Sequence, residues 1–157
     1  MLKIKFPKKT DYSLFFKKEG MDFLNFFTKK KKLFDQRVNS DPHIPELRDL
    51  YNLYQLILLN NRTTILEYGC GWSTLVMHFA LMKNNRIKSG QTFTRCGNPF
   101  ELISVDNSRK FIKISKARIK KFSKNYQKVK FNFSEVKMTK FKEAVFKAFG
   151  HKGIDFK

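Results

Sequence analysis

A short glycine-containing segment, "ILEYGCGWSTL" at residues 65–75, restricts the possible folds of this chain more than any other feature. The β-branched and apolar run "TTILEY" (63–68) precedes the glycines and is typical of a buried strand. The run "STLVMHFALM" follows them, is apolar nearly all round and predicts a buried helix with Ser73 or Thr74 at its N-cap. A strand, a tight glycine turn and a buried helix form the first half of a βαβ unit.

The second half of that unit follows in the sequence. "ELISVD" (101–106) predicts a second buried strand, and the apolar residues of 107–122 share one arc of a helix. Apolar residues alternate in a third, half-exposed strand at 129–133, and those of 141–149 fit a final amphipathic helix. The alternation of strands and helices predicts an α/β fold, with a parallel core of three strands and flanking helices.

The beginning of the chain predicts a helical N-terminal extension. Within residues 11–28, large apolar side chains recur at roughly helical spacing, and Asp11 or Ser13 could cap the helix. Gly20 is a weak point in this helix.

A turn-forming segment, "NSDPHIP" (39–45), then marks a boundary, because each proline restricts the residue before it. Pro45 is well suited to the first turn of a further helix, which the apolar spacing extends to about Asn60. We therefore expect two parts, a helical N-terminal extension (1–44) and an α/β domain (45–157).

The net charge of the 157-residue chain is +20, which normally suggests a polyanionic partner. Lysine outnumbers arginine 26 to 7, however, and arginine is the better bidentate ligand of phosphate and bases. Lys, Phe, Ile and Asn are abundant together, as an AT-rich coding sequence would also produce. A basic nucleic-acid-binding module is therefore an alternative that the sequence does not favour.

The two cysteines, Cys70 and Cys96, lie in no CxxC pair and beside no histidine at metal-ligand spacing. We expect no metal site and a reducing compartment. The longest apolar stretch, "LYNLYQLILL", is interrupted by Asn52 and Gln55 and is too short to cross a bilayer. No signal peptide is recognised at the N-terminus. The expectation is a cytoplasmic protein without a membrane partner.

Ligands of open parallel sheets bind outside the carboxyl ends of the strands, where Gly69 and Gly71 are predicted to lie. The dinucleotide fingerprint needs a third glycine where Thr74 stands and an acidic residue about twenty positions further on. The P-loop needs four residues between its glycines and then Lys-Ser or Lys-Thr. Neither pattern is present, so NAD and nucleoside triphosphates are disfavoured.

The pattern that remains is E-x-G-x-G, in which Glu67 precedes Gly69 by two residues, with a second acid, Asp106, at the tip of the next strand. "ILEYGCGWST" resembles motif I of the class I S-adenosylmethionine-dependent methyltransferases, and "LISVDNS" looks like their second motif. The resemblance covers about residues 46–136. It implies a partial Rossmann-like methyltransferase fold with S-adenosylmethionine as its small-molecule cofactor.

Carried over by position, the resemblance implies that Glu67 holds the methionine amino end and that Asp106 accepts hydrogen bonds from the ribose hydroxyls. The turn between them would line the ligand with its backbone. The expected cofactor-binding residues are Glu67, Tyr68, Gly69, Cys70, Gly71, Trp72, Ser73, Thr74, Asp106 and Asn107. No catalytic residue is assigned, and the methyl acceptor is not identified from the sequence.

Several of these residues also have a structural explanation. Glu67 could be a capping or salt-bridged carboxylate, the glycines could serve only a tight turn, and Asp106 could cap the next helix. Packing is the better explanation for Trp72 than stacking on adenine, and His78 is better explained as a core residue than as a base.

Seven strands are usual for the family, and three are predicted here. The expectation is therefore a truncated methyltransferase that contains the cofactor-binding half and lacks most of the acceptor half. Residues 83–100 could form a lid or acceptor loop, or an ordinary surface insertion. A non-catalytic Rossmann-like scaffold is the remaining alternative.

Overall fold

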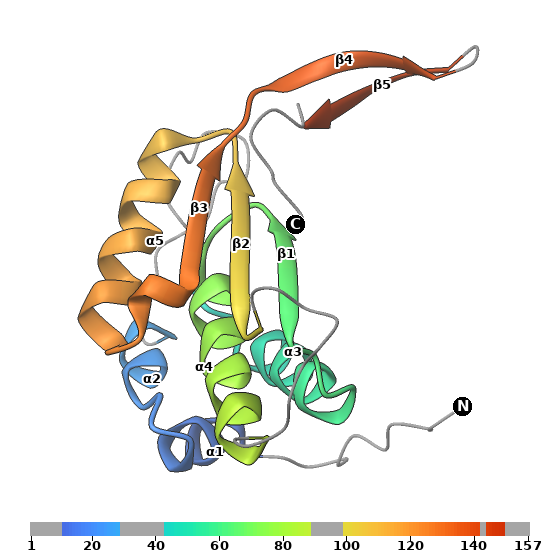
Figure 1. Cartoon of the computed structure of the whole chain (residues 1–157). Helices are drawn as coiled ribbons and strands as arrows, with labels where there is room; N and C mark the ends of the chain where they lie inside the picture. The colour runs from blue at the N-terminus through green and yellow to red at the C-terminus, as the bar shows by residue number, and fades with distance from the viewer. Residues whose placement is uncertain (1–10, 29–42, 89–98, 142–143, 150–157) are drawn as a thin grey trace.

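A three-stranded parallel sheet lies at the centre of the protein (Figure 1). The computed structural model describes residues 11–28, 43–88, 99–141 and 144–149. The sheet has the order β1-β2-β3, and its strands are β1 (Thr64–Tyr68), β2 (Glu101–Asp106) and β3 (Val129–Phe133). The expected α/β architecture, with a three-stranded parallel sheet and flanking helices, is confirmed.

The register of the sheet brings the carboxyl ends of β1 and β2 side by side. Glu67 lies opposite Ser104, and the N–H of Gly69 extends the pairing by donating to the Val105 carbonyl at 2.7 Å. All six residues of β2 are buried, as expected for a strand with a neighbour on each side. The position just beyond Tyr68 is therefore fixed relative to the tip of β2.

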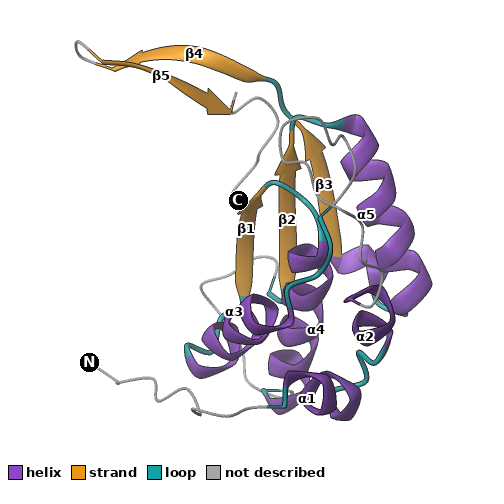
Figure 2. Cartoon of the chain, turned by 180° about the vertical axis from the view of Figure 1, so that it is seen from behind, coloured by secondary structure: helices purple, strands orange, loops and turns teal. Residues whose placement is uncertain are grey.

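Two helices connect the strands and cover the same face of the sheet (Figure 2). Helix α4 (Trp72–Ile87) joins β1 to β2, and α5 (Arg109–Phe122) joins β2 to β3. Right-handed crossovers between successive neighbouring strands place both helices on one side. Helix α3 (Leu47–Leu59) packs against α4. Within the described ranges, no helix has both the length and the apolarity needed to cross a membrane.

The N-terminal segment forms two short helices, α1 (Tyr12–Lys18) and α2 (Phe23–Thr28), where one was predicted. The chain reverses at Gly20, whose φ of +77° favours glycine. Asp11 caps α1, because its Oδ1 accepts from the Leu14 N–H at 3.0 Å. Phe16 and Leu24 are fully buried and belong to the same apolar core as α3, α4 and β2. These helices are therefore packed into the main core.

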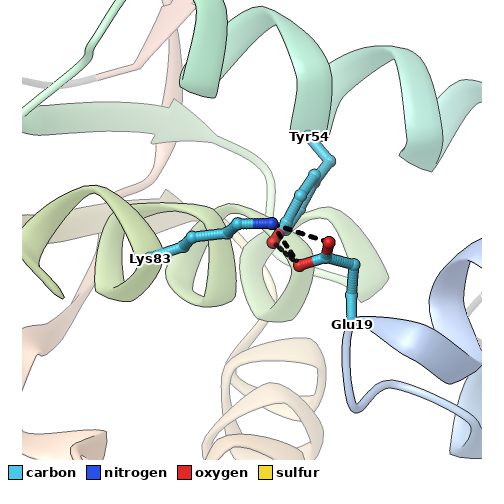
Figure 3. Close-up of polar contacts among 3 residues, drawn as sticks. All are labelled: Glu19, Tyr54 and Lys83. Carbon is cyan, nitrogen blue, oxygen red and sulfur yellow. Dashed lines mark hydrogen bonds and ion pairs between the residues drawn. The ribbon is translucent and has the colours of Figure 1, made fainter. Parts of the chain in front are cut away.

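A polar contact also holds α1 to the other helices (Figure 3). Glu19, just after α1, accepts from the Tyr54 hydroxyl of α3 at 2.6 Å and from the Lys83 ammonium of α4 at 2.6 and 2.7 Å. Burial, followed by this hydrogen bond, raises the pKa of Tyr54. The contact joins three helices through one carboxylate.

The helix predicted at 141–149 is wrong. Residues Val136–Phe141 (β4) and Ala144–Phe149 (β5) form an antiparallel hairpin in which Phe141 lies opposite Ala144. A short apolar run fits both a helical and an extended period, and the valine and phenylalanine content favours the strand. The hairpin extends beyond the carboxyl end of β3 (Figure 1).

Several predicted features lie outside the described residues. These are the basic run at 29–32, the boundary between the two predicted parts as far as residue 42, most of the interval 83–100 with Cys96, and the C-terminal residues after 149.

His78 lies inside the core, where its side chain on α4 is fully buried. Its Nε2 lies 2.7 Å from the Ser123 hydroxyl, and burial lowers its pKa to about 4. Because the folded-state pKa is below the ordinary value, the unfolded state takes up the proton first as the pH falls, and stability decreases from about pH 6.5 down to pH 4.

We expect the chain to lose about 2 kcal/mol of unfolding free energy between pH 7 and pH 5 through this histidine. The variant His78→Gln keeps a polar partner for Ser123 and has no titrating group. Its unfolding free energy should therefore fall by about 2 kcal/mol less than that of the unaltered chain over the same pH interval. Urea unfolding of both proteins at the two pH values measures the difference. Parallel pH profiles would contradict the assignment.

Candidate functional site

The glycine turn joins β1 to α4 at the carboxyl edge of the sheet. Gly69 has a φ of +87°, in the left-handed region that favours glycine, whereas Gly71 is extended and serves as the N-cap of α4. The helix thus begins earlier than the predicted cap at Ser73 or Thr74. The Thr74 hydroxyl instead accepts from the Gly71 N–H at 2.9 Å, so it still satisfies a donor at the helix start.

Asp106 holds this turn against the tip of β2. Its Oδ2 accepts from the Cys70 N–H at 2.7 Å, and its Oδ1 accepts from the Ser108 N–H at 2.6 Å. Asp106 does not cap α5, because the Ser108 hydroxyl does so by accepting from the Phe111 N–H at 3.2 Å. The carboxylate is 4% exposed and accepts one backbone donor on each oxygen, which leaves lone pairs for two more donors.

Glu67, at the tip of β1, stabilises the same turn through hydrogen bonds. Its Oε1 accepts from the Ser73 hydroxyl at 2.5 Å, and its Oε2 accepts from the hydroxyls of Thr74 and Ser104 at 2.7 and 2.9 Å. Burial raises the pKa of Glu67, and the three hydroxyl hydrogen bonds oppose this effect. With three donors already bound, Glu67 has room for about one more. It joins β1, β2 and α4 in a way that the sequence did not predict.

Trp72 and Arg118 lie together beneath the turn. The Trp72 ring is 7% exposed and packs against Phe27 of α2 at a centroid distance of 4.7 Å. The Arg118 guanidinium lies 3.8 Å from the Trp72 ring centroid. Burial lowers the pKa of Arg118, and among the described residues its buried Nη1 has no hydrogen-bond partner. The indole is thus a packing residue at the edge of the site.

Cys70 lies between the two glycines of the turn. Burial raises the pKa of its thiol to about 12, and the nearby Asp106 carboxylate acts in the same direction. The Ser115 hydroxyl opposes this shift by hydrogen bonding to the thiol. Cys70 is therefore a neutral thiol near neutral pH and a poor nucleophile.

These residues line one cavity of about 460 Å³, within the range of small-molecule sites. Nine of the ten predicted cofactor-binding residues contribute to it, and Thr74 lies behind them, fully buried. We call this cavity the turn cleft. Its lining residues are His43, Ile44, Pro45, Glu46, Asp49, Leu50, Glu67, Tyr68, Gly69, Cys70, Gly71, Trp72, Ser73, Asp106, Asn107, Phe111 and Arg118.

The turn cleft is acidic in a strongly basic chain. Four of its lining residues are carboxylates, namely Glu46, Asp49, Glu67 and Asp106. Among the residues that the structure describes, Arg118 is the one arginine or lysine that lines it, although the chain has a net charge of +20. Carboxylates around a concave site favour a cationic or hydroxyl-rich ligand and disfavour a polyphosphate.

Sequence reasoning missed the residues that two other elements bring to the cleft. Residues just before and within the first turn of α3 form one wall, with Glu46 and Asp49. Phe111 and Arg118 of α5 form another. A signal for Arg118 was present, because Phe111, Ser115 and Arg118 recur at i, i+4 and i+7 and so share one helix face. The α3 wall has no comparable signal in the sequence.

The two glycines of the turn differ in a way that can be measured. A Cβ added at either Gly69 or Gly71 meets nothing within 4 Å, so only the backbone conformation separates them. We expect Gly69→Ala to cost about 1–2 kcal/mol of unfolding free energy, because its φ is positive. Gly71→Ala should change it by less than about 0.5 kcal/mol. Chemical denaturation of the two variants tests this, and equal losses would contradict it.

The described residues include no group of three or more His, Cys, Asp or Glu side chains placed to hold a metal ion. Comparison of the chain with protein-family models, curated proteins and solved structures gave no match. The chemistry of the turn cleft is therefore the basis on which a function can be inferred.

Proposed function

We propose that the turn cleft binds S-adenosylmethionine and that the chain is the cofactor-binding part of a class I Rossmann-like methyltransferase. The observation that carries the proposal is the pair of carboxylates at neighbouring strand tips, joined through the glycine turn by the hydrogen bond from the Cys70 N–H to Asp106. A nucleoside with a cationic sulfonium matches both the hydroxyl-accepting and the acidic character of this site.

The topology supports the proposal. The sheet order β3-β2-β1 corresponds to the first half of the Rossmann order 3-2-1-4-5-6. In such sheets the ligand lies outside the carboxyl ends of the strands, beside the turn that follows the first strand. The turn cleft has this position, and the open space above Gly69 and Gly71 lets a ligand approach the backbone closely.

The two carboxylates are not equivalent in this proposal. Asp106 is the better ligand for the ribose hydroxyls, because each of its oxygens accepts one backbone N–H and keeps further lone pairs. Glu67 is bound by three hydroxyls, so its main role is to hold the turn, with one lone pair for the methionine amino group. An ammonium beside Glu67 would also offset the cost of its burial.

In methyl transfer the main contribution of the protein is to align the acceptor with the methyl group. A bound sulfonium cofactor would supply a methyl group for in-line displacement, with the carbon–sulfur electron pair returning to sulfur as the acceptor lone pair forms the new bond. The residues of the turn would hold the cofactor in one orientation, and such positioning can supply much of the rate enhancement. The acidic lining stabilises positive charge before transfer.

Thermal unfolding in the presence of S-adenosylhomocysteine tests the proposal and separates it from a non-catalytic scaffold. At a ligand concentration of about one hundred times Kd, the midpoint should rise by about 5–10 °C, because the ligand binds only the folded state. An equimolar mixture of adenosine and methionine is the matched control and should shift it much less. No shift at millimolar ligand would support the scaffold instead, and equal shifts with the mixture would contradict recognition of the intact nucleoside.

A further inference from the structure

The segment between Asp106 and Glu135 contains no acidic residue. Ten of its 28 residues (107–134) are lysine or arginine. A coding bias raises the lysine content throughout a chain, but it does not by itself remove carboxylates from one segment. Residues 68–100 also lack acidic residues but include only four lysines and arginines, so 107–134 stands out by combining many cations with no carboxylate.

Four of these cations form a single row along α5. Arg109, Lys113, Lys116 and Lys120 recur at i, i+4, i+7 and i+11, and all four are exposed. We call this row the α5 stripe; it spans about 16 Å of helix. Among the described residues none of the four pairs with a carboxylate, whereas the nearby Lys130 pairs with Glu101 at 2.8 Å.

Aromatic side chains accompany the stripe. Its cationic groups lie 4.0, 5.8 and 5.7 Å from three ring centroids, in the pairs Arg109–Phe133, Lys116–Phe131 and Lys120–Tyr126. Tyr126 is 48% exposed. Beside it lies a hollow of about 290 Å³, lined by Lys116, Ile119, Lys120, Tyr126, Gln127, Val129 and Phe131. Three of the four cations of the stripe thus lie over aromatic rings.

The like charges of the stripe repel one another when nothing is bound. Like charges four residues apart, as in Arg109 and Lys113 or Lys116 and Lys120, destabilise a helix by about 0.2–0.5 kcal/mol per pair. A surface that serves only solubility intersperses both signs. A polyanion on the stripe would remove the repulsion and displace counterions.

We propose that the α5 stripe and its aromatic neighbours bind single-stranded nucleic acid. The lysines and Arg109 would contact successive phosphates, and an unstacked base would lie in the hollow against Tyr126. A duplex keeps its bases stacked, so it could use the cations but not the ring. An anionic membrane fits less well, because Ile112 and Ile119 of α5 are buried in the protein and the helix offers no broad apolar face.

Fluorescence anisotropy with the full chain and labelled 15-nucleotide oligo(U) and oligo(dT) tests the proposal. With four phosphate contacts, the affinity for the single strands should fall about fiftyfold between 50 and 200 mM salt. A duplex of the same length should bind at least about fivefold more weakly at 50 mM salt. Comparison of oligo(U) with oligo(dT) shows whether the sugar affects the affinity. Equal or tighter binding of the duplex would overturn the role of the ring.

Two matched triple variants separate the stripe from overall charge. Lys113→Gln, Lys116→Gln and Lys120→Gln together should reduce single-strand affinity at least tenfold and flatten its salt dependence. Lys17→Gln, Lys18→Gln and Lys137→Gln remove the same charge elsewhere and should change affinity less than about threefold. Equal losses in the two triples would overturn the proposal.

Further measurements separate the remaining explanations. Tyr126→Ala should weaken single-strand binding without changing the salt slope, and an unchanged affinity would remove the aromatic contribution. Vesicles containing 25% phosphatidylglycerol should bind more weakly than the oligonucleotides, and a preference for vesicles would overturn the proposal. Circular dichroism checks that each variant folds. The proposal does not depend on the function of the turn cleft, so the stripe triple should keep any thermal shift with S-adenosylhomocysteine.

Discussion

Replacing Asp106 by alanine is expected to lower the affinity for S-adenosylhomocysteine by at least about a hundredfold. The change removes the proposed acceptor of two ribose hydroxyl hydrogen bonds, and it also frees the Cys70 and Ser108 N–H groups that hold the turn in place. Each hydrogen bond from a ribose hydroxyl to the charged carboxylate is worth about 1.5–3 kcal/mol, and 1.4 kcal/mol corresponds to a factor of ten in affinity. Isothermal titration calorimetry measures the loss.

Two further variants make this result specific. Asp106→Asn keeps one oxygen acceptor without the charge, so it should bind with an affinity between those of the parent and Asp106→Ala. Glu135→Gln removes the same charge from an exposed position after β3 and should leave the affinity unchanged. Binding by Asp106→Ala within about threefold of the parent would remove Asp106 from the proposed site.

Replacing Phe16 by alanine is expected to destabilise the whole protein by about 3–5 kcal/mol. Phe16 belongs to the N-terminal segment, yet it is fully buried in the core shared with α3, α4 and β2. Its ring contacts Phe15 edge-on at a centroid distance of 5.3 Å, so the substitution loses both burial and an aromatic contact. Urea unfolding measures the change.

Phe26 provides the matched control, because it lies in α2 of the same segment and is 61% exposed. Phe26→Ala should cost about 1 kcal/mol or less. The large loss in Phe16→Ala should appear in a single cooperative transition. A loss below 1 kcal/mol, or a separate transition for the N-terminal helices, would show that they do not share the core.

The sheet was predictable because its strands are short apolar runs with clear boundaries. The predicted limits of β2 agree with the structure residue for residue, and β1 differs by one residue at its start. The hairpin at 136–149 was missed for a physical reason. The apolar residues of 141–149 fit the spacing of a helix as well as that of a strand, so the pattern alone does not distinguish the two. The deciding factor is pairing with residues 136–141.

The turn cleft was predictable only in part. Glu67, the glycines and Asp106 follow from position in a parallel sheet, since carboxyl ends of neighbouring strands share one edge. The contacts of Glu67 with Ser73, Thr74 and Ser104 required the register of β1 on β2 and the start of α4, which a single sequence does not supply. Glu46 and Asp49 required the packing of α3 against α4, which joins segments distant in the chain.

The central claim is that a sulfonium nucleoside lies on the turn between β1 and α4. The most direct test is a titration of the ¹⁵N-labelled chain with S-adenosylmethionine, followed through its backbone amide resonances. If the nucleoside binds there, we expect saturable changes concentrated at Gly69, Cys70, Gly71 and Asn107, with little change along the α5 stripe. Saturable changes centred elsewhere, or none at millimolar ligand, would contradict it.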